Sequence, residues 1–231
     1  MSEVTLLIPM LTGMSWESFV TIRNMRGPIG ETLITPMVPL SEARNVLVRR
    51  FLRDTTASHA MMLAGDMVYP PDALENLLQT AAAHPEAAAI IGIYYARAYN
   101  FKPMVFEKLG VPFIGHPNDK PFRVHSSGLD CALFRRDLFE KMSSSRGRWF
   151  RFTERLSEDI FFCDSMPTGM ELWCDPRVKC GHLSKVVINE RWSRNAKFAV
   201  DLLGLDDLPL QPVVDEEPRK KPPVTVVKDG E

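Results

Sequence analysis

MMLAGDMVYPP, residues 61–71, is a hydrophobic run that ends in a single carboxylate and is followed by two prolines. Proline in the first turn of a helix lacks only an N–H that would be unpaired there, so Pro70 and Pro71 predict that a helix begins at this point. Asp66 is therefore predicted at the carboxyl end of a buried strand, the edge at which open α/β sheets bind ligands. The alternative is that Asp66 only caps the following turn.

Strands and helices are predicted to alternate on both sides of this stretch. Short apolar runs are typical of buried parallel strands, and apolar residues at helical spacing are typical of helices. The expected order is a strand at 4–9, a weak helix within 15–25, a strand at 32–35, a helix capped by Ser41, a strand at 60–63, a helix at 72–83 and a strand at 87–94. This alternation predicts an α/β fold, with a mostly parallel, Rossmann-like sheet flanked by helices.

The second half of the chain is less regular. Residues 96–125 are rich in proline, glycine and aromatic residues, which predicts a long excursion with one or two short strands. The elements expected after it are a strand at 129–134, a helix at 136–142, a mobile loop at 143–148, a helix at 158–165 and short strands at 172–174 and 178–180. The proline-rich, charged residues 207–231 are predicted to be a disordered tail.

Composition limits the class of protein. With 231 residues the chain is long enough for one sizeable core. No apolar run approaches the roughly 20 residues that span a bilayer, and residues 1–15 do not resemble a signal peptide. The four cysteines then predict reduced thiols and a cytoplasmic location. The net charge of −1 selects no partner.

Four segments together carry a resemblance to a known family. They are SEARN at 41–45, GDM at 65–67, SEDIFFC at 157–163 and DPRVKCGHL at 175–183. Their order and spacing resemble the glycosyltransferases of the GT-A fold, particularly the small family 2-type enzymes often found in phage and prophage genomes. The resemblance covers roughly residues 3–190. It implies one domain at 1–206, with a nucleotide-sugar-binding half at 1–95 and an acceptor and catalytic half at 96–206.

The family holds a divalent cation with an Asp-x-Asp motif at the end of a strand, and the resemblance implies a cation here as well. The last Asp of the motif matches Asp66, but the first falls on Ala64, so one carboxylate is missing. A later metal ligand of the family matches His182. Asp66, His182 and two phosphate oxygens would form a shell that suits Mn²⁺ and is acceptable for Mg²⁺.

The implied donor is a nucleoside-diphosphate sugar, linked to UDP or GDP. On the resemblance, Pro9, Arg44, Asn45, Gly65 and Asp66 belong to the donor side. A planar guanidinium at Arg44 suits a phosphate. The alternative for Arg44 is an arginine that faces solvent from its helix.

The acidic pair Glu158 and Asp159 matches the catalytic carboxylates of the family. The resemblance implies that Asp159 is the general base on the acceptor hydroxyl and that Glu158 supports it or binds the acceptor. The alternative is that both acids cap the helix that begins near Ser157. An inverting hexosyl- or pentosyltransferase is favoured, although retaining chemistry stays open.

The acceptor side is implied for Ser127 and Gly128, which match a glycine-containing loop of the family, and for Trp149. Aromatic rings at Trp149, Phe150 and Phe152 suit stacking on a sugar or a base, but a place in the core explains them equally well.

Three other interpretations remain open. Cys163, Cys174, Cys180 and His182 have the right chemistry for structural zinc, but no Cys-x-x-Cys pair is present. Ala64 favours a nucleotide-sugar-binding module with little or no turnover. A nucleotidyltransferase would use the same sheet, but ordinarily needs more carboxylates.

The acceptor is the least determined partner. Basic residues gather within 146–155 and 177–197, with Trp149 and Trp192 near them, a pattern that suits a nucleic-acid backbone as well as a solvated surface. The phage resemblance makes a hydroxymethylated base in DNA a candidate acceptor. Hydroxyl groups of cell-wall, lipid-linked or protein acceptors are the alternatives.

Overall fold

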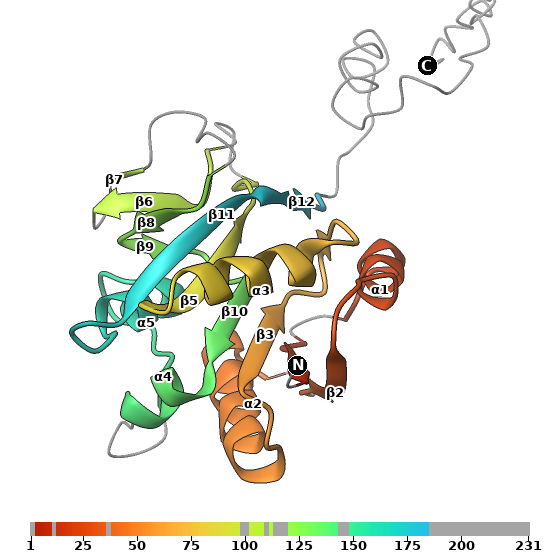
Figure 1. The fold of residues 1–231 in the computed structure, drawn as a ribbon, viewed down its shortest axis with the longest axis horizontal. Helices are drawn as coiled ribbons and strands as arrows, with labels where there is room; N and C mark the ends of the chain where they lie inside the picture. The colour runs from red at the N-terminus through yellow and green to blue at the C-terminus, as the bar shows by residue number, and fades with distance from the viewer. Residues whose placement is uncertain are drawn as a thin grey trace, which may run out of the picture. The chain divides into compact units, whose positions relative to one another are not determined.

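A seven-stranded mixed sheet lies at the centre of the computed structural model (Figure 1). In spatial order its strands are β2 (Ile29–Ile34), β1 (Val4–Ile8), β3 (His59–Leu63), β10 (Cys131–Arg135), β5 (Ala87–Ile93), β11 (Glu171–Lys179) and β8 (Phe122–Val124). β1 is parallel to β2 and β3, and β11 is parallel to β5, whereas β10 and β8 run antiparallel to their neighbours. The structure describes residues 3–10, 13–35, 38–97, 102–108, 111–112, 120–142 and 148–184.

Both faces of the sheet are buried under helices. Along β1, Leu7 packs into one apolar cluster, whereas Leu6 and Ile8 pack into another, because successive side chains of a strand point to opposite faces. The first cluster includes residues of α2 (Leu40–Asp54), α4 (Arg136–Lys141) and α5 (Glu158–Asp164). The second includes residues of α3 (Ala73–Ala83), which crosses in front of the sheet in Figure 1. The predicted α/β class, with helices on both faces, is confirmed.

Two small sheets accompany the central sheet. β4 (Met67–Val68) pairs with β12 (Gly181–His182), and α1 (Trp16–Arg23) packs against β4. β6 (Val105–Lys108) lies between β7 (Val111–Pro112) and β9 (Ser126–Ser127). The pairing of β4 with β12 joins segments that are far apart in the sequence, and it is this pairing that positions the candidate site.

Several predicted boundaries are wrong in detail. The two short strands expected near 172–174 and 178–180 are one strand, β11, which continues through Asp175 and Pro176 with a shift in register. Residues 96–125 hold β6, β7 and β8, not one or two strands. α2 begins at Leu40, with Pro39 in the capping position, so Ser41 lies inside the first turn and does not cap the helix. Likewise, Pro70 and Pro71 precede α3 and are not part of its first turn.

Two predictions lie outside the described residues. These are the mobile loop, apart from Arg148, and the disordered tail at 207–231. Within the described residues, no helix is long and apolar enough to cross a membrane.

Candidate active site

Asp66 lies in the tight turn between β3 and β4, at the carboxyl edge of the central sheet, as predicted. Gly65 is required here because a Cβ atom would come within 2.7 Å of the carbonyl oxygen of Gly13. The backbone of this loop is also tied to the start of α1, because the Ser15 N–H donates to the Gly65 carbonyl at 2.8 Å. The turn is therefore held against the segment that follows β1.

His182 reaches Asp66 through the small β4–β12 sheet. In that sheet His182 lies opposite Met67, and the Leu183 N–H donates to the Asp66 carbonyl at 2.9 Å. The two side chains then meet, with His182 Nε2 3.9 Å from Asp66 Oδ2. The structure thus brings together the two residues that the resemblance implied as metal ligands.

Hydrogen bonds fix which nitrogen of the His182 ring carries the proton. Nδ1 lies 2.8 Å from the Tyr95 carbonyl oxygen, which can only accept. Nε2 accepts from Nε of Arg97 at 2.7 Å. The ring is therefore neutral, with its proton on Nδ1 and its lone pair on Nε2. A carbonyl partner of this kind is the usual support for a metal-ligating histidine.

The pair fits a divalent cation as a partial shell. Two metal–ligand bonds of about 2.1 Å can span the 3.9 Å between Asp66 Oδ2 and His182 Nε2. One carboxylate and one imidazole suit Mn²⁺. Within the described residues no group of three or more His, Cys, Asp and Glu side chains could hold a metal ion, so this part of the chain supplies only a partial shell.

The same observation removes the zinc alternative for the described part of the chain. Burial also raises the pKa of the Cys163 thiol to about 12, and it raises the pKa of Cys174 as well. A thiol that stays protonated at neutral pH is a poor zinc ligand, because zinc binds the thiolate.

Asp159 belongs to a second cluster, centred on Arg44. The Arg44 side chain is only 1% exposed, and its guanidinium pairs with Asp159, with Glu158 at 3.1 Å and with Asp130 at 2.8 Å. The Phe150 ring lies 5.6 Å from the guanidinium carbon. Because one positive charge faces three carboxyl groups, the cluster carries excess negative charge when these groups are ionised.

The two acids at the start of α5 differ in exposure. The Glu158 side chain is 4% exposed and that of Asp159 is 15% exposed. Neither carboxylate serves only as a helix cap, because both pair with Arg44. Asp159 is thus the more accessible of the two carboxylates, and the division of roles between it and Glu158 stays a prediction.

Asn45 organises the chain that leads to α5. Its side-chain oxygen accepts from the N–H groups of Trp149 and Phe150, and its amide donates to the Phe150 carbonyl at 2.8 Å. Trp149 is buried and donates its indole N–H to the Phe139 carbonyl. Both side chains therefore have partners within the protein. The predicted contacts of Asn45 with the donor and of Trp149 with the acceptor stay predictions.

The loop at Ser127 and Gly128 is also internal. Ser127 is fully buried and donates to the Met104 carbonyl at 2.5 Å. A Cβ atom at Gly128 would collide with the Tyr94 hydroxyl, which explains the glycine by packing. Pro9, at the end of β1, is buried as well. Ligand contacts by these three residues remain untested.

Three residues of the site were missed by the sequence reasoning: Arg97, Asp130 and Tyr69. Arg97 follows β5 and Asp130 precedes β10, so both lie at the carboxyl edge where Asp66 was expected. The Tyr69 hydroxyl accepts from the Ala64 N–H at 2.7 Å and lies 2.9 Å from the Asp130 carbonyl. Its burial, the main cause, raises the Tyr69 pKa well above the usual value. Tyr69 therefore connects the loop of Asp66 to the Arg44 cluster.

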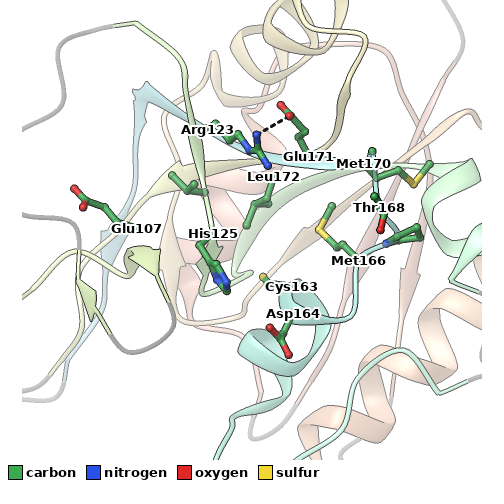
Figure 2. A pocket seen from close by; sticks show the side chains of 13 residues that line it. Glu107, Arg123, His125, Cys163, Asp164, Met166, Thr168, Met170, Glu171 and Leu172 are labelled. Atoms are coloured by element: carbon green, nitrogen blue, oxygen red, sulfur yellow. Dashed lines mark ion pairs between the residues drawn. The ribbon is translucent and has the colours of Figure 1, made fainter.

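A separate cavity of about 560 Å³ lies beside β8 and the far end of α5 (Figure 2). Figure 2 shows Arg123 paired with Glu171 at its rim, and His125 and Asp164 lining it. Neither Asp66, His182 nor Asp159 lines this cavity. It is therefore distinct from the candidate site.

No family model matches the sequence, and no curated protein matches it either. Among solved structures, the chain is similar to A197 from STIV, with a TM-score of 0.61 and 16% identity over 79% of this chain and 86% of that chain. It is also similar to GalNAc-T7, crystallised with UDP, GalNAc and Mn²⁺, with a TM-score of 0.56 and 8% identity. That match covers 80% of this chain but only 44% of GalNAc-T7.

These identities are low enough that the likeness concerns the fold alone. The fold is of the GT-A type, an α/β architecture with a large, mostly parallel mixed sheet flanked by helices. The predicted fold class is confirmed at this level.

Proposed function

We propose that the protein is a metal-dependent glycosyltransferase that moves a sugar from a UDP- or GDP-linked donor to an acceptor hydroxyl. The observation that carries the proposal is the meeting of Asp66 Oδ2 and His182 Nε2, 3.9 Å apart, at the carboxyl edge of a GT-A-type sheet. This is the edge at which open α/β sheets bind ligands. The carboxylate of Asp159, held by Arg44, would supply a base of the kind that the reaction needs.

On the donor side, Asp66 and His182 would hold Mn²⁺ or Mg²⁺ together with oxygens of the diphosphate. The cation would neutralise charge on the leaving diphosphate. Gly65 and Pro9 lie on the adjoining loops, where backbone groups can approach the nucleotide. The His182 proton is committed to the Tyr95 carbonyl, so its Nε2 lone pair, which accepts from Arg97 in this structure, is the one that would coordinate the cation.

On the acceptor side, Asp159 would take the proton of the acceptor hydroxyl. The acceptor oxygen then forms a bond to the anomeric carbon, and the bond from that carbon to the phosphate oxygen breaks. The electron pair of that bond stays with the diphosphate. Arg44, buried against Asp159 and Glu158, acts as a positioning residue in this scheme.

The most direct test is calorimetry with UDP and GDP, each with Mn²⁺ and with a chelator. Binding that requires Mn²⁺, and that Asp66→Asn and His182→Ala both weaken, is the expected result. Binding that ignores the chelator, or no binding of either nucleotide, would contradict the metal site. Arg123→Ala, at the separate cavity, is the matched control and should bind as the wild type does.

Ala64 favours one competing function, a nucleotide-sugar-binding module without turnover. The missing carboxylate reduces the number of protein ligands for the cation. The two functions differ in a single measurement, the release of free UDP or GDP from the donor with and without acceptor mixtures. A module would bind the donor and release no nucleotide diphosphate above the uncatalysed rate.

For the acceptor, we propose the exposed surface formed by Arg151, Phe152 and Arg155, in the segment that precedes α5. Phe152 is the exposed aromatic ring of this segment, whereas Trp149 is buried. Exposed arginines close in sequence to an exposed aromatic ring suit a nucleic acid, and a hydroxymethylated base in DNA is the acceptor to try first. The basic residues at 185–197 lie outside the described residues, and Arg177 is paired with the buried Asp175.

Salt dependence tests this acceptor. Each phosphate that the protein neutralises contributes about −0.9 to the log–log slope of duplex binding against salt, so Arg151→Ala with Arg155→Ala should flatten the slope by about 1.8. Binding of the free nucleotide should not change. Undetectable or salt-independent DNA binding, with no sugar transferred to hydroxymethylated bases, would redirect the search to saccharide, lipid-linked and protein hydroxyls.

A further inference from the structure

Arg97 occupies the space between the two candidate ligands. Its Nη2 pairs with Asp66 Oδ2, and its Nε donates to His182 Nε2 at 2.7 Å. One guanidinium therefore contacts both atoms that the proposed cation would use. Asp66 thus has a positively charged partner within the protein.

We propose that Arg97 and a divalent cation are alternative occupants of the Asp66–His182 site, and that Arg97, when displaced, binds the diphosphate of the donor. This inference rests on the proposed function, because it takes Asp66 and His182 as the cation ligands. It adds a role for a residue that belongs to none of the four segments behind the family resemblance.

The two occupants exclude one another at His182. The proton of the neutral ring is on Nδ1 and is used by the Tyr95 carbonyl, so Nε2 has one lone pair. That lone pair either accepts from Arg97 or coordinates a cation. At Asp66 the guanidinium of Arg97 and the cation would in addition repel each other, because both would contact the same carboxylate oxygen.

Arg97 is free to leave at little cost. Its side chain is 45% exposed and that of Asp66 is 44% exposed, and ion pairs with this exposure contribute little because water screens them. Arg97 also follows β5 by only a few residues, so its flexible side chain stays at the edge of the sheet when the guanidinium turns away from Asp66.

Charge complementarity identifies the diphosphate as the new partner of Arg97. A donor diphosphate carries two negative charges, so the donor, a divalent cation, Asp66 and Arg97 sum to zero. When the sugar leaves, the diphosphate gains one more negative charge, and a planar guanidinium fork is well matched to phosphate oxygens. Cation and nucleotide should therefore bind cooperatively, each favouring the state in which Arg97 has left Asp66.

Titration of Mn²⁺ followed by electron paramagnetic resonance tests this proposal without any activity measurement. For Mn²⁺ alone, Arg97→Ala should bind up to about fivefold more tightly than the wild type, because the competitor is removed and an exposed ion pair is worth no more than that. With Mn²⁺ saturating, the same variant should bind UDP or GDP at least about tenfold more weakly, because a charge-assisted hydrogen bond is lost. The two shifts have opposite signs.

Arg123→Ala is the matched control, because Arg123 forms a comparable exposed ion pair with Glu171 at 3.0 Å. It should change neither affinity. Unchanged or weaker binding of Mn²⁺ to Arg97→Ala would overturn the competition, and unchanged nucleotide affinity would overturn the contact with the diphosphate.

These outcomes are distinct from failure of the proposed function. If Arg97→Ala binds Mn²⁺ more tightly and the nucleotide more weakly, but the wild-type protein transfers no sugar, the inference holds for a binding module. If wild-type protein binds no Mn²⁺, or if Asp66→Asn leaves Mn²⁺ affinity unchanged, the cation site is wrong and the inference falls with it. A third outcome is that the wild type and Arg97→Ala bind Mn²⁺ equally well, whereas Asp66→Asn does not bind it. This outcome would refute the inference and leave the cation site in place.

Discussion

Arg44 and Arg97 are both arginines that pair with carboxylates at the same edge of the sheet, yet their surroundings are opposite. Arg44 is 1% exposed and contacts three acids, whereas Arg97 is 45% exposed and contacts one acid and one imidazole. A buried charge cannot lose its partners without a large desolvation penalty, but an exposed charge exchanges them for water. The Arg44 cluster is thus a fixed support, and the Arg97 cluster is the part that can change on binding.

The largest effect on the rate of sugar transfer is expected for Asp159, which the Arg44 cluster holds in place. Asp159→Asn should lower kcat by about 10² to 10⁴, because a general base contributes that much, with nucleotide affinity unchanged. Rates of sugar transfer and calorimetry on the same preparation measure both. Asp164→Asn, at the other end of α5, is the control. If Asp159→Asn is fully active, Asp159 is not the general base, and its role is limited to the ion pair with Arg44.

Removal of the buried guanidinium should be the largest change in stability. Arg44→Ala should lower the free energy of unfolding by about 3–5 kcal/mol, because it leaves buried carboxylates without a partner. Urea denaturation gives the value. Arg44→Lys keeps the charge but not the planar fork, so it should lose less. A loss below 1 kcal/mol for Arg44→Ala would remove the distinction between the two arginines.

Tyr69 connects the two regions, and its hydroxyl can be removed without changing the ring. Tyr69→Phe should cost about 1–3 kcal/mol of stability, because the Ala64 N–H and the Asp130 carbonyl lose a buried partner. The same variant should weaken Mn²⁺ binding if the turn at Asp66 depends on this bond. Tyr95→Phe is the control, since the half-exposed Tyr95 supports His182 through its backbone carbonyl.

The smallest effect on stability is expected at the exposed arginine. Arg97→Ala should change the free energy of unfolding by no more than about 1 kcal/mol, as measured by urea denaturation beside Arg44→Ala. A loss as large as that of Arg44→Ala would mean that Arg97 is structural and not exchangeable.

The fold was largely predictable because its strands are continuous apolar runs. β1, β3 and β5 are buried on both faces, so nearly all of their residues are apolar and the strands are easily recognised between helical segments. The sequence predicts two short strands where the structure has the single strand β11, because Asp175 and Pro176 resemble a break between strands. The Asp175 carboxylate is instead satisfied inside the protein by Thr80 at 2.7 Å and by Arg177.

The site was predictable only in part. The motifs indicated Asp66, His182 and Asp159, and the structure places Asp66 and His182 together, whereas the roles of all three stay predictions. The burial of Arg44 was missed, although a signal existed, because Arg44 continues the helical stripe of Leu47, Val48 and Phe51. A charged residue on such a stripe requires buried partners, and these come from α5 and from the start of β10.

Arg97 had no comparable signal. It lies in the irregular segment after β5, where neither periodicity nor a motif indicates which way a side chain points. Its contacts depend on the β4–β12 pairing, which joins residues that are far apart in the sequence. Only the three-dimensional arrangement brings Arg97 against Asp66 and His182.

The β4–β12 pairing also sets an order of events during synthesis on the ribosome. Asp66 and Arg97 leave the exit tunnel long before His182, because chains emerge from the amino terminus. While β12 is still inside the ribosome, the loop of Asp66 therefore lacks its β12 partner. The imidazole joins the site last, so a nascent chain would acquire its cation site only as β12 docks, after all seven strands of the central sheet have been made.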